Sequence, residues 1–236
     1  MKSFLTFLLI SSFLTAACQK IFFNDEESSR EIPLKDFHAA KISGIYNMVL
    51  VQDSTNRLEI TGKNNINGIE ANIIDDTLII DDHKKRTFNP NKNSLTLHFS
   101  NLTYMIFNNP VNLSNSDTIK ADKFMLVAVG EIAEVRLIIK CNYLMALNNA
   151  NTLGNLYFKG KAETCWLWDR YGSNMFADSL QCKDAVIYQE SIGDITVNAS
   201  DNILAFIRGP GNIYYRGSPV IKISEQRGAG KIIPLN

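Results

Sequence analysis

Residues 209–219 read "GPGNIYYRGSP", and residues 191–201, eighteen positions earlier, read "SIGDITVNASD". In both stretches a glycine precedes a small polar residue, a run of β-forming residues and a polar turn. The same order of features recurs upstream and is marked by Gly130, Gly154, Gly172, Gly193 and Gly211, at intervals of 24, 18, 21 and 18 residues. A period near 20 residues with several short strands per repeat indicates a β-solenoid, and we expect these glycines at its turns.

The predicted fold is all-β, a right-handed parallel β-helix with about 20 residues per coil. One coil is too small to bury its own apolar residues, but stacked coils pair each strand with copies about 4.8 Å away. The inward side chains then form one continuous core, and glycine permits the sharp bends between faces. An antiparallel β-sandwich is the alternative; it explains the strands but not the repeated order of features.

The front half of the chain has a different pattern. Residues 42–62 ("ISGIYNMVLVQDSTNRLEITG") and 71–82 ("ANIIDDTLIIDD") each read as strand, turn, strand, with Asp75-Asp76 as the second turn. We interpret them as hairpins that cap the solenoid or as its irregular first coils. Some cover is required because an open solenoid end exposes unpaired strand edges.

The first 18 residues have the features of an export signal. Lys2 precedes an apolar run from Phe4 to Leu14, and the small residues 15–17 lead to Cys18. The run is too short to span a membrane, and small residues before a cysteine are typical of a bacterial lipoprotein signal. We therefore predict lipidation of Cys18 and a place in the cell envelope, most simply at the outer membrane; an ordinary cleaved signal is the alternative.

Residues 19–35 are polar after Phe23 and are predicted to form a tether, and residues 36–236 a single solenoid domain. The chain has 24 basic and 24 acidic residues, so its formal net charge is zero. This argues against a nucleic acid as a partner, since neutralising phosphates requires a basic face.

Three cysteines follow Cys18, namely Cys141, Cys165 and Cys182. Their spacing contains no CxxC pair, which argues against a zinc site. An exported protein can join two of them in a disulfide, whereas a packed interior can hold them as free thiols. The sequence leaves both arrangements open.

Both ends of the domain carry family motifs. The first ones are Phe37, Ile42-Ser43-Gly44, Asn47-Met48-Val49, "LEITG" at 58–62 and Leu78-Ile79-Ile80, and the last are "GPG" at 209–211 and "GAG" at 228–230. With these motifs the chain resembles the "putative auto-transporter adhesin, head GIN domain" family over residues 36–232. The resemblance implies an exported β-helix of adhesin type. It brings no catalytic residues.

The usual catalytic and metal motifs are missing from the sequence. There is no P-loop, no GxSxG and no HExxH, and we interpret His38, His83 and His98 as ordinary surface or strand residues. The carboxylates of Asp75, Asp76, Asp81 and Asp82 could suit calcium, but a solvated hairpin explains them more simply. We expect no metal and no cofactor.

One set of charged residues recurs with the repeat. Counting back three positions from successive repeat glycines gives Asp169, Glu190 and Arg208, which we expect on one outward face. Paired carboxylates beside an arginine could bind or act on a sugar, whereas a surface charge ladder needs no ligand. If Asp169 points outward, alternation turns Trp166 and Trp168 inward and Leu167 outward. Tyr188 and Phe206 would then join the charged stack as an apolar ridge suited to a partner.

The sequence thus predicts a lipid-anchored envelope protein without an active site, which presents a rigid repetitive face to a glycan or a protein. Such a face could also join copies of this chain in a homo-oligomer. The alternatives are a polysaccharide-acting β-helix enzyme that uses Asp169, Glu190 and Arg208, and a purely structural envelope module.

Overall fold

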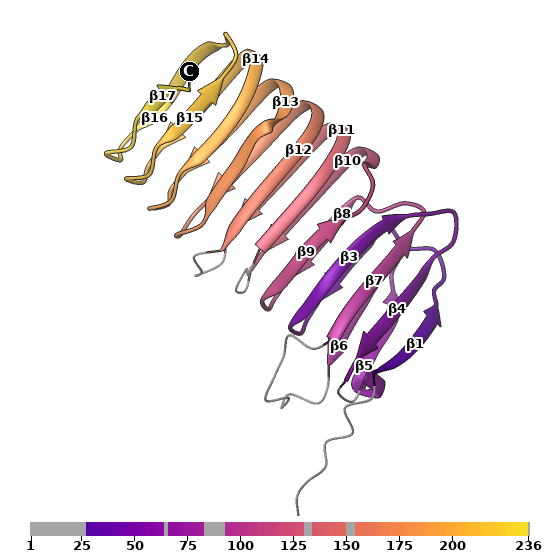
Figure 1. Cartoon of the computed structure of the whole chain (residues 1–236). Helices are drawn as coiled ribbons and strands as arrows, with labels where there is room; N and C mark the ends of the chain where they lie inside the picture. The colour runs from indigo at the N-terminus through magenta and orange to yellow at the C-terminus, as the bar shows by residue number, and fades with distance from the viewer. Residues whose placement is uncertain (1–26, 64–65, 83–92, 130–133, 150–153, 236) are drawn as a thin grey trace, which may run out of the picture.

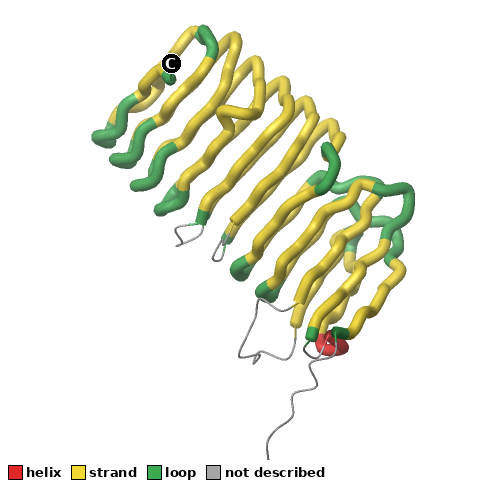
Figure 2. Tube along the Cα trace, viewed as in Figure 1, coloured by secondary structure: helices red, strands yellow, loops and turns green. Residues whose placement is uncertain are grey.

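The computed structural model describes residues 27–63, 66–82, 93–129, 134–149 and 154–235. Over these ranges the chain is built of strands stacked side by side along one axis, as Figures 1 and 2 show. The helical part of the described chain is one short 3-10 turn, η1 (Ile66–Gly68). No described helix has the length and apolar character needed to cross a membrane.

The described strands of the N-terminal half are short. They are β1 (Ser28–Pro33), β2 (Ala39–Ile42), β3 (Tyr46–Gln52), β4 (Arg57–Gly62), β5 (Ile69–Ile74), β6 (Thr77–Asp82), β7 (Asn93–Phe99), β8 (Tyr104–Phe107) and β9 (Val111–Asn115). The described C-terminal half contains five longer strands, followed by three short ones. They are β10 (Ile119–Ala128), β11 (Glu134–Asn148), β12 (Asn155–Asp169), β13 (Asn174–Gln189), β14 (Ile195–Ile207), β15 (Ile213–Arg216), β16 (Val220–Gln226) and β17 (Ile232–Pro234).

Successive coils of the C-terminal half pair in parallel about one repeat apart. Leu144 lies opposite Cys165, Cys165 opposite Ala185, and Ala185 opposite Ile203. These offsets of 21, 20 and 18 residues confirm the predicted solenoid and its period, and they exclude the antiparallel sandwich.

Each long strand runs through two sheets. The beginning of β11 pairs with β9, whereas its end pairs with β10. We call the sheet that contains β9, β15, β17 and the first halves of β11–β14 the front sheet. The sheet that contains β8, β10, β16 and the second halves of β11–β14 is the back sheet (Figure 1). The bend between them lies near Lys140–Asn142 in β11.

The core lies between the two sheets and is formed by aligned inward side chains. The front sheet contributes Val135, Leu156, Met175, Ile195 and Ile213, and the back sheet Leu126, Ala146, Leu167, Ile187 and Ala205. All of them are buried, so the alternation of each strand places its aliphatic residues in one shared interior.

The N-terminal end of the stack is closed by antiparallel strands. β2 and β3 pair in parallel with β8 and β9, 65 residues later, and β6 and β7 lie on their other side. Beyond these, β5 pairs with β6, and β4 and β1 extend the sheet from β7, all antiparallel. The predicted hairpin turn is confirmed, since Asp75 and Asp76 connect β5 to β6 with positive φ angles.

The tether predicted over residues 19–35 is wrong for part of its length. Residues 28–33 form β1, which pairs with β4 from Ser28 opposite Gly62 to Pro33 opposite Arg57. The alternation of Ile32 with charged neighbours is weak, so this edge strand is defined by its partner and not by its own pattern.

The glycines at the turns form a column only in part. The residues aligned there are Gly154, Ser173, Gly193, Gly211 and Gly230, as the flanking strand register shows. Gly172 lies one position before this column, which corrects its predicted place, and Gly130 lies outside the described residues. A Cβ on Gly193 would lie 1.9 Å from the Ser173 carbonyl oxygen, so the close approach of adjacent turns requires glycine.

The three described cysteines are free and buried. The Sγ atoms of Cys165 and Cys182 are 3.0 Å apart. Burial, with a smaller contribution from Asp122, raises the pKa of Cys141 to about 11. Free thiols in the packed interior are therefore the arrangement that the structure contains.

Candidate functional site

The outward side of the back sheet carries two columns of apolar side chains. One contains Met125, Met145, Trp166, Val186 and Leu204, and the other Val127, Leu147, Trp168, Tyr188 and Phe206. All of them are partly exposed and alternate with buried core residues. We call the part formed by Trp166, Trp168, Val186, Tyr188, Leu204 and Phe206 the aromatic face.

The predicted orientation of the two tryptophans is wrong. Trp166 and Trp168 point outward and are partly exposed, whereas Leu167 between them is fully buried. Leu167 lies in register with Ala146 and Ile187, in a narrow interior column of aliphatic side chains. The space between Ala146 and Ile187 admits a leucine side chain more readily than an indole. Leu167 therefore points inward, and its neighbours Trp166 and Trp168 point outward. Tyr188 and Phe206 point outward as expected.

Rings of the aromatic face stack along the solenoid axis. The ring centroids of Tyr188 and Phe206 lie 4.3 Å apart with planes 3° apart, and those of Trp166 and Tyr188 lie 5.7 Å apart at 14°. The Arg170 guanidinium lies 5.0 Å from the Trp168 ring centroid. Rings arranged in this way cover one another's faces, so this surface offers mainly ring edges to a ligand.

A column of alternating charges borders the aromatic face. Arg208 pairs with Glu190 at 2.5 Å and with Glu225 at 2.7 Å, and Arg170 pairs with Glu190 at 3.3 Å. The hydrogen bond from Arg208 lowers the pKa of Glu225 below its ordinary value. A carboxylate held ionised in this way is a poor general acid, so the column is suited to fixing a surface and not to transferring protons.

Asp169 does not belong to this column, which corrects its predicted place. It aligns with Gln189, one residue before Glu190, and its side chain is fully buried. Its Oδ1 atom accepts a hydrogen bond of 2.7 Å from the Asn148 amide, and burial raises its pKa. The paired carboxylates required by the enzyme alternative are therefore not assembled, because only Glu190 of the two faces outward.

The sequence analysis missed Arg170 and Glu225. Counting back three positions from Ser173, the residue aligned with Gly193, leads to Arg170, whereas counting from Gly172 led to Asp169. The sequence does not show that Ser173, and not Gly172, aligns with Gly193, and this alignment is what places Arg170 in the charged column. Glu225 lies opposite Phe206 because of an irregularity in β16, which no residue pattern indicates.

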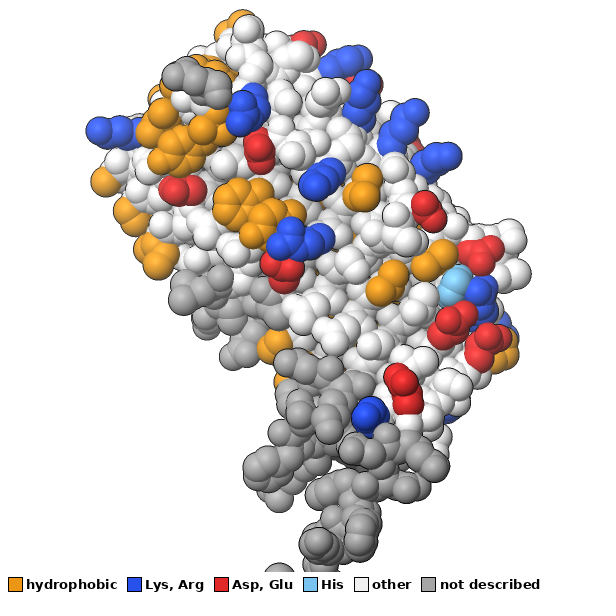
Figure 3. All heavy atoms as spheres, in the orientation of Figure 1, with side chains coloured by type: hydrophobic (Ala, Val, Ile, Leu, Met, Phe, Trp, Pro, Cys, Tyr) orange, Lys and Arg blue, Asp and Glu red, His pale blue; other side chains and the backbone are white. Residues whose placement is uncertain are grey.

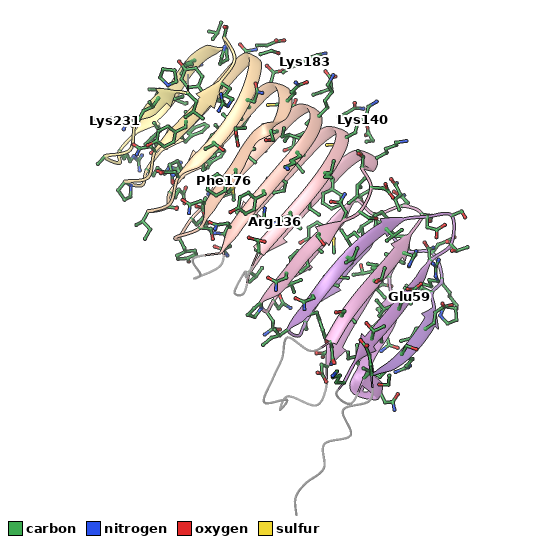
Figure 4. The ribbon with its side chains drawn as sticks, in the orientation of Figure 1. Glu59, Arg136, Lys140, Phe176, Lys183 and Lys231 are labelled. Atoms are coloured by element: carbon green, nitrogen blue, oxygen red, sulfur yellow. The ribbon has the colours of Figure 1, made fainter. Side chains whose placement is uncertain are left out.

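The front sheet carries a smaller aromatic stack. The ring centroids of Tyr157 and Phe176 lie 4.9 Å apart, and the Arg136 guanidinium lies 4.1 Å from the Tyr157 ring. Figure 4 labels Arg136 and Phe176 on this sheet, and Figure 3 shows the apolar patch and the neighbouring basic side chains in the same region. This pair resembles Tyr188–Phe206 in chemistry but lies on the opposite face.

His98, which we interpreted as an ordinary histidine, lies in a charged cluster at the N-terminal end. Its Nδ1 is 3.3 Å from Asp53 and its Nε2 is 3.2 Å from Glu59, and Arg57 contacts both carboxylates at 3.1 Å. These side chains come from β4, β7 and the turn after β3. The cluster joins the closing strands of the solenoid, and the hydroxyl groups of Ser54 and Thr55 hydrogen-bond to Asp53 and Arg57 at its edge.

Comparison with known proteins agrees with this architecture. Residues 36–219 match the family described as "Putative auto-transporter adhesin, head GIN domain". The chain belongs to this family. Among curated proteins no relative matches the head GIN chain.

Several solved structures share the head GIN fold. A putative adhesin from Bacteroides fragilis is 25% identical with a TM-score of 0.79, and the match covers 90% of this chain and 99% of that one. A putative adhesin from Parabacteroides merdae is 19% identical with a TM-score of 0.57 and coverages of 90% and 98%. A putative lipid binding protein from Parabacteroides distasonis is 18% identical with a TM-score of 0.53 and the same coverages. The last two matches show the fold alone.

Proposed function

We propose that this head GIN protein is a lipid-anchored adhesin of the cell envelope that binds a protein partner through the aromatic face and catalyses no reaction. The observation that carries the proposal is the aromatic face itself, with six apolar side chains in register on the outside of a rigid sheet. Patches of this kind, rich in aromatic residues and bordered by arginine, are typical of interface centres.

The ring geometry favours a protein partner over a glycan. A sugar stacks on the exposed face of an aromatic ring, but the faces of Tyr188 and Phe206 cover each other. The Nε1 atoms of Trp166 and Trp168 are shielded from solvent, so they are not available to sugar hydroxyls. Ring edges and aliphatic tips can instead pack against apolar side chains of another protein.

The bordering ion pairs support the same choice. Arg170, Glu190, Arg208 and Glu225 neutralise one another, so the rim of the face has fixed geometry and little net charge. A rim of this kind orients a partner without strong attraction of ions, and the apolar centre then supplies most of the binding free energy.

The test compares two matched double variants in a bead-adhesion assay. Beads carrying the mature chain are applied to intact cells before and after the cells are treated with protease. The variant Tyr188→Ser/Phe206→Ser should weaken adhesion at least about tenfold, since buried aromatic residues dominate interface energies. The control Tyr157→Ser/Phe176→Ser removes an equivalent stack from the front sheet and should leave adhesion unchanged.

Protease treatment should abolish adhesion of the wild-type chain if the receptor is a protein. If adhesion persists after protease treatment but is lost after glycosidase treatment, the receptor is a glycan and the proposed protein partner is wrong. Equal losses in both double variants, or no loss in either, would contradict the aromatic face as the binding surface. Concentration-dependent sedimentation of the free chain would identify a second copy as the occupant.

A further inference from the structure

A second surface lies at the corner where β11–β14 bend from the front to the back sheet, beside the start of β10. It is a groove of about 950 Å³ that crosses several coils. Its floor is made of small side chains in successive coils, namely Ala121, Cys141, Ala162 and Cys182; Ala121 is partly buried and the other three are buried. A long ligand could therefore lie close to the backbone along the groove.

One wall of the groove is a column of lysines. Lys120 lies opposite Lys140, and Lys140 opposite Lys161, in parallel register. Strand spacing places their backbones about 4.8 Å apart, so like charges stand directly side by side. Figure 4 labels Lys140 and Lys183 at this corner, and Figure 3 shows basic side chains following the same edge of the molecule.

The three lysines form no ion pair with any residue that the structure describes. The acidic groups on the other wall are already engaged, since Asp122 accepts a 2.6 Å hydrogen bond from Asn142 and Glu163 pairs with Lys183 at 2.5 Å. Four lysines and two acidic residues line the groove, a difference of +2, in a chain whose net charge is zero.

The column of alternating charges beside the aromatic face differs from the lysine column in how its charges are compensated. There Glu190 lies between Arg170 and Arg208, so charges of opposite sign alternate from coil to coil. Along the lysine column this alternation is absent, and the uncompensated charges destabilise the fold by cross-strand repulsion. A ligand that supplies the missing negative charges would remove this cost.

We propose that the corner groove binds a linear acidic polysaccharide whose carboxylates contact Lys120, Lys140 and Lys161. The far end of the groove is lined by Gln181, Asn198 and Ser200, which can bind sugar hydroxyls. Lysine binds an anion as a point charge, and no arginine lines the groove to hold a carboxylate or a phosphate in a bidentate fork. The amide and hydroxyl side chains beside the lysines favour a saccharide that carries single charges along its length over a simple polyanion. This site is distinct from the aromatic face and independent of its partner.

The experiment uses polygalacturonate as the probe and its methyl ester as the matched neutral polymer. Affinity is measured by calorimetry for the wild-type chain and for Lys120→Gln/Lys140→Gln/Lys161→Gln, at about 50 mM and about 300 mM salt. The wild-type chain should bind polygalacturonate but not the methyl ester, and its affinity for polygalacturonate should be lower at the higher salt concentration. The triple variant should lose at least about tenfold in affinity and most of the salt dependence.

The control variant Lys41→Gln/Lys222→Gln/Lys231→Gln changes the net charge equally at exposed positions outside the groove and should bind as the wild type does. The groove variant should melt no lower than the wild type, because it removes repulsion, so lost binding cannot be attributed to unfolding. Tyr188→Ser/Phe206→Ser should retain polygalacturonate binding, which separates this site from the proposed adhesion face.

The proposal is overturned if the wild-type chain does not bind polygalacturonate, if the ester binds equally well, or if the control variant loses as much affinity as the groove variant. Polyphosphate binding of equal strength that depends on the same three lysines would also overturn it, because the site would then recognise charge without a saccharide.

Discussion

Asp169 illustrates how the direction of a side chain, into the core or out to the surface, decides its role. Its carboxyl group points into the solenoid beside Asn148, at the end of β12, while its neighbour Arg170 joins the outward charged column. Gln189 occupies the equivalent position one coil later and hydrogen-bonds to Gly193 and Ser191 in the adjacent turn. Gln189 thus uses its inward amide to hold the adjacent turn.

The first prediction concerns the pH dependence of stability. Burial raises the pKa of Asp169 above its ordinary value of 3.8, although hydrogen bonds from Ser191 and Asn148 oppose the shift. Between 3.8 and the raised pKa, the folded chain retains a proton that the unfolded chain has released. The free energy of unfolding therefore falls as pH rises through this window, and the full penalty remains above it.

Asp169→Asn removes this titration and keeps an acceptor for the Asn148 amide. We expect the variant to be more stable than the wild type by about 1 kcal/mol at neutral pH and to lose this advantage near pH 4. Urea denaturation across this pH range measures the difference. A lower stability of Asp169→Asn than of the wild type at neutral pH would contradict the prediction.

At the scale of elements, the turn after each back-sheet strand controls how closely the coils stack. Gly193 lies against the Ser173 carbonyl, and Gly211 lies against the Gly193 carbonyl, each so closely that a Cβ would come within 1.9 Å. The sequence shows that glycine recurs at the turns. It does not show which residues align from coil to coil, because the turn around Gly172 is displaced by one residue and Ser173 takes the aligned place.

The prediction at this scale is that Gly193→Ala destabilises the fold by about 1–3 kcal/mol, since backbone atoms must move to admit the new Cβ. Chemical denaturation followed by circular dichroism measures the loss. Ala229→Ser, at an exposed turn tip in the last coil, is the control and should stay within about 0.5 kcal/mol of the wild type. Equal stability of Gly193→Ala and the wild type would show that the turns are not closely stacked.

For the whole molecule, the closed N-terminal end is the part of the described fold that follows the predicted anchor most closely in the sequence. Antiparallel strands β1, β4 and β5 cover this end, and β1 begins ten residues after Cys18. The aromatic face and the corner groove lie on β10–β14, several coils further along the stack (Figure 1). Both surfaces therefore lie on coils other than those formed by the strands that follow the predicted anchor most closely in the sequence.

The prediction for the whole molecule is that Cys18→Ser releases the protein from membranes, because the anchoring acyl chains are lost; each buried methylene contributes about 0.8 kcal/mol. Cell fractionation and metabolic labelling with a fatty acid measure anchoring. Cys141→Ser, which alters an interior cysteine instead, should remain membrane-bound and labelled. Unchanged membrane retention of Cys18→Ser would refute the anchor. Residues 1–26 lie outside the described structure, so this test depends on the sequence alone.

The sequence by itself determined the solenoid and its period, because turns that contain glycine and apolar alternation recur along the C-terminal half and need no distant partner to be recognised. It also indicated the family, through the motifs at both ends of the domain. It also placed Glu190 and Arg208 together. The tertiary structure alone decided that Trp166 and Trp168 face outward, that Asp169 is buried and that three lysines share one column. The physical reason is that side chains alternate with period two along a strand, so a displacement of one residue at a turn reverses every orientation after it. Only the register between neighbouring coils specifies that phase.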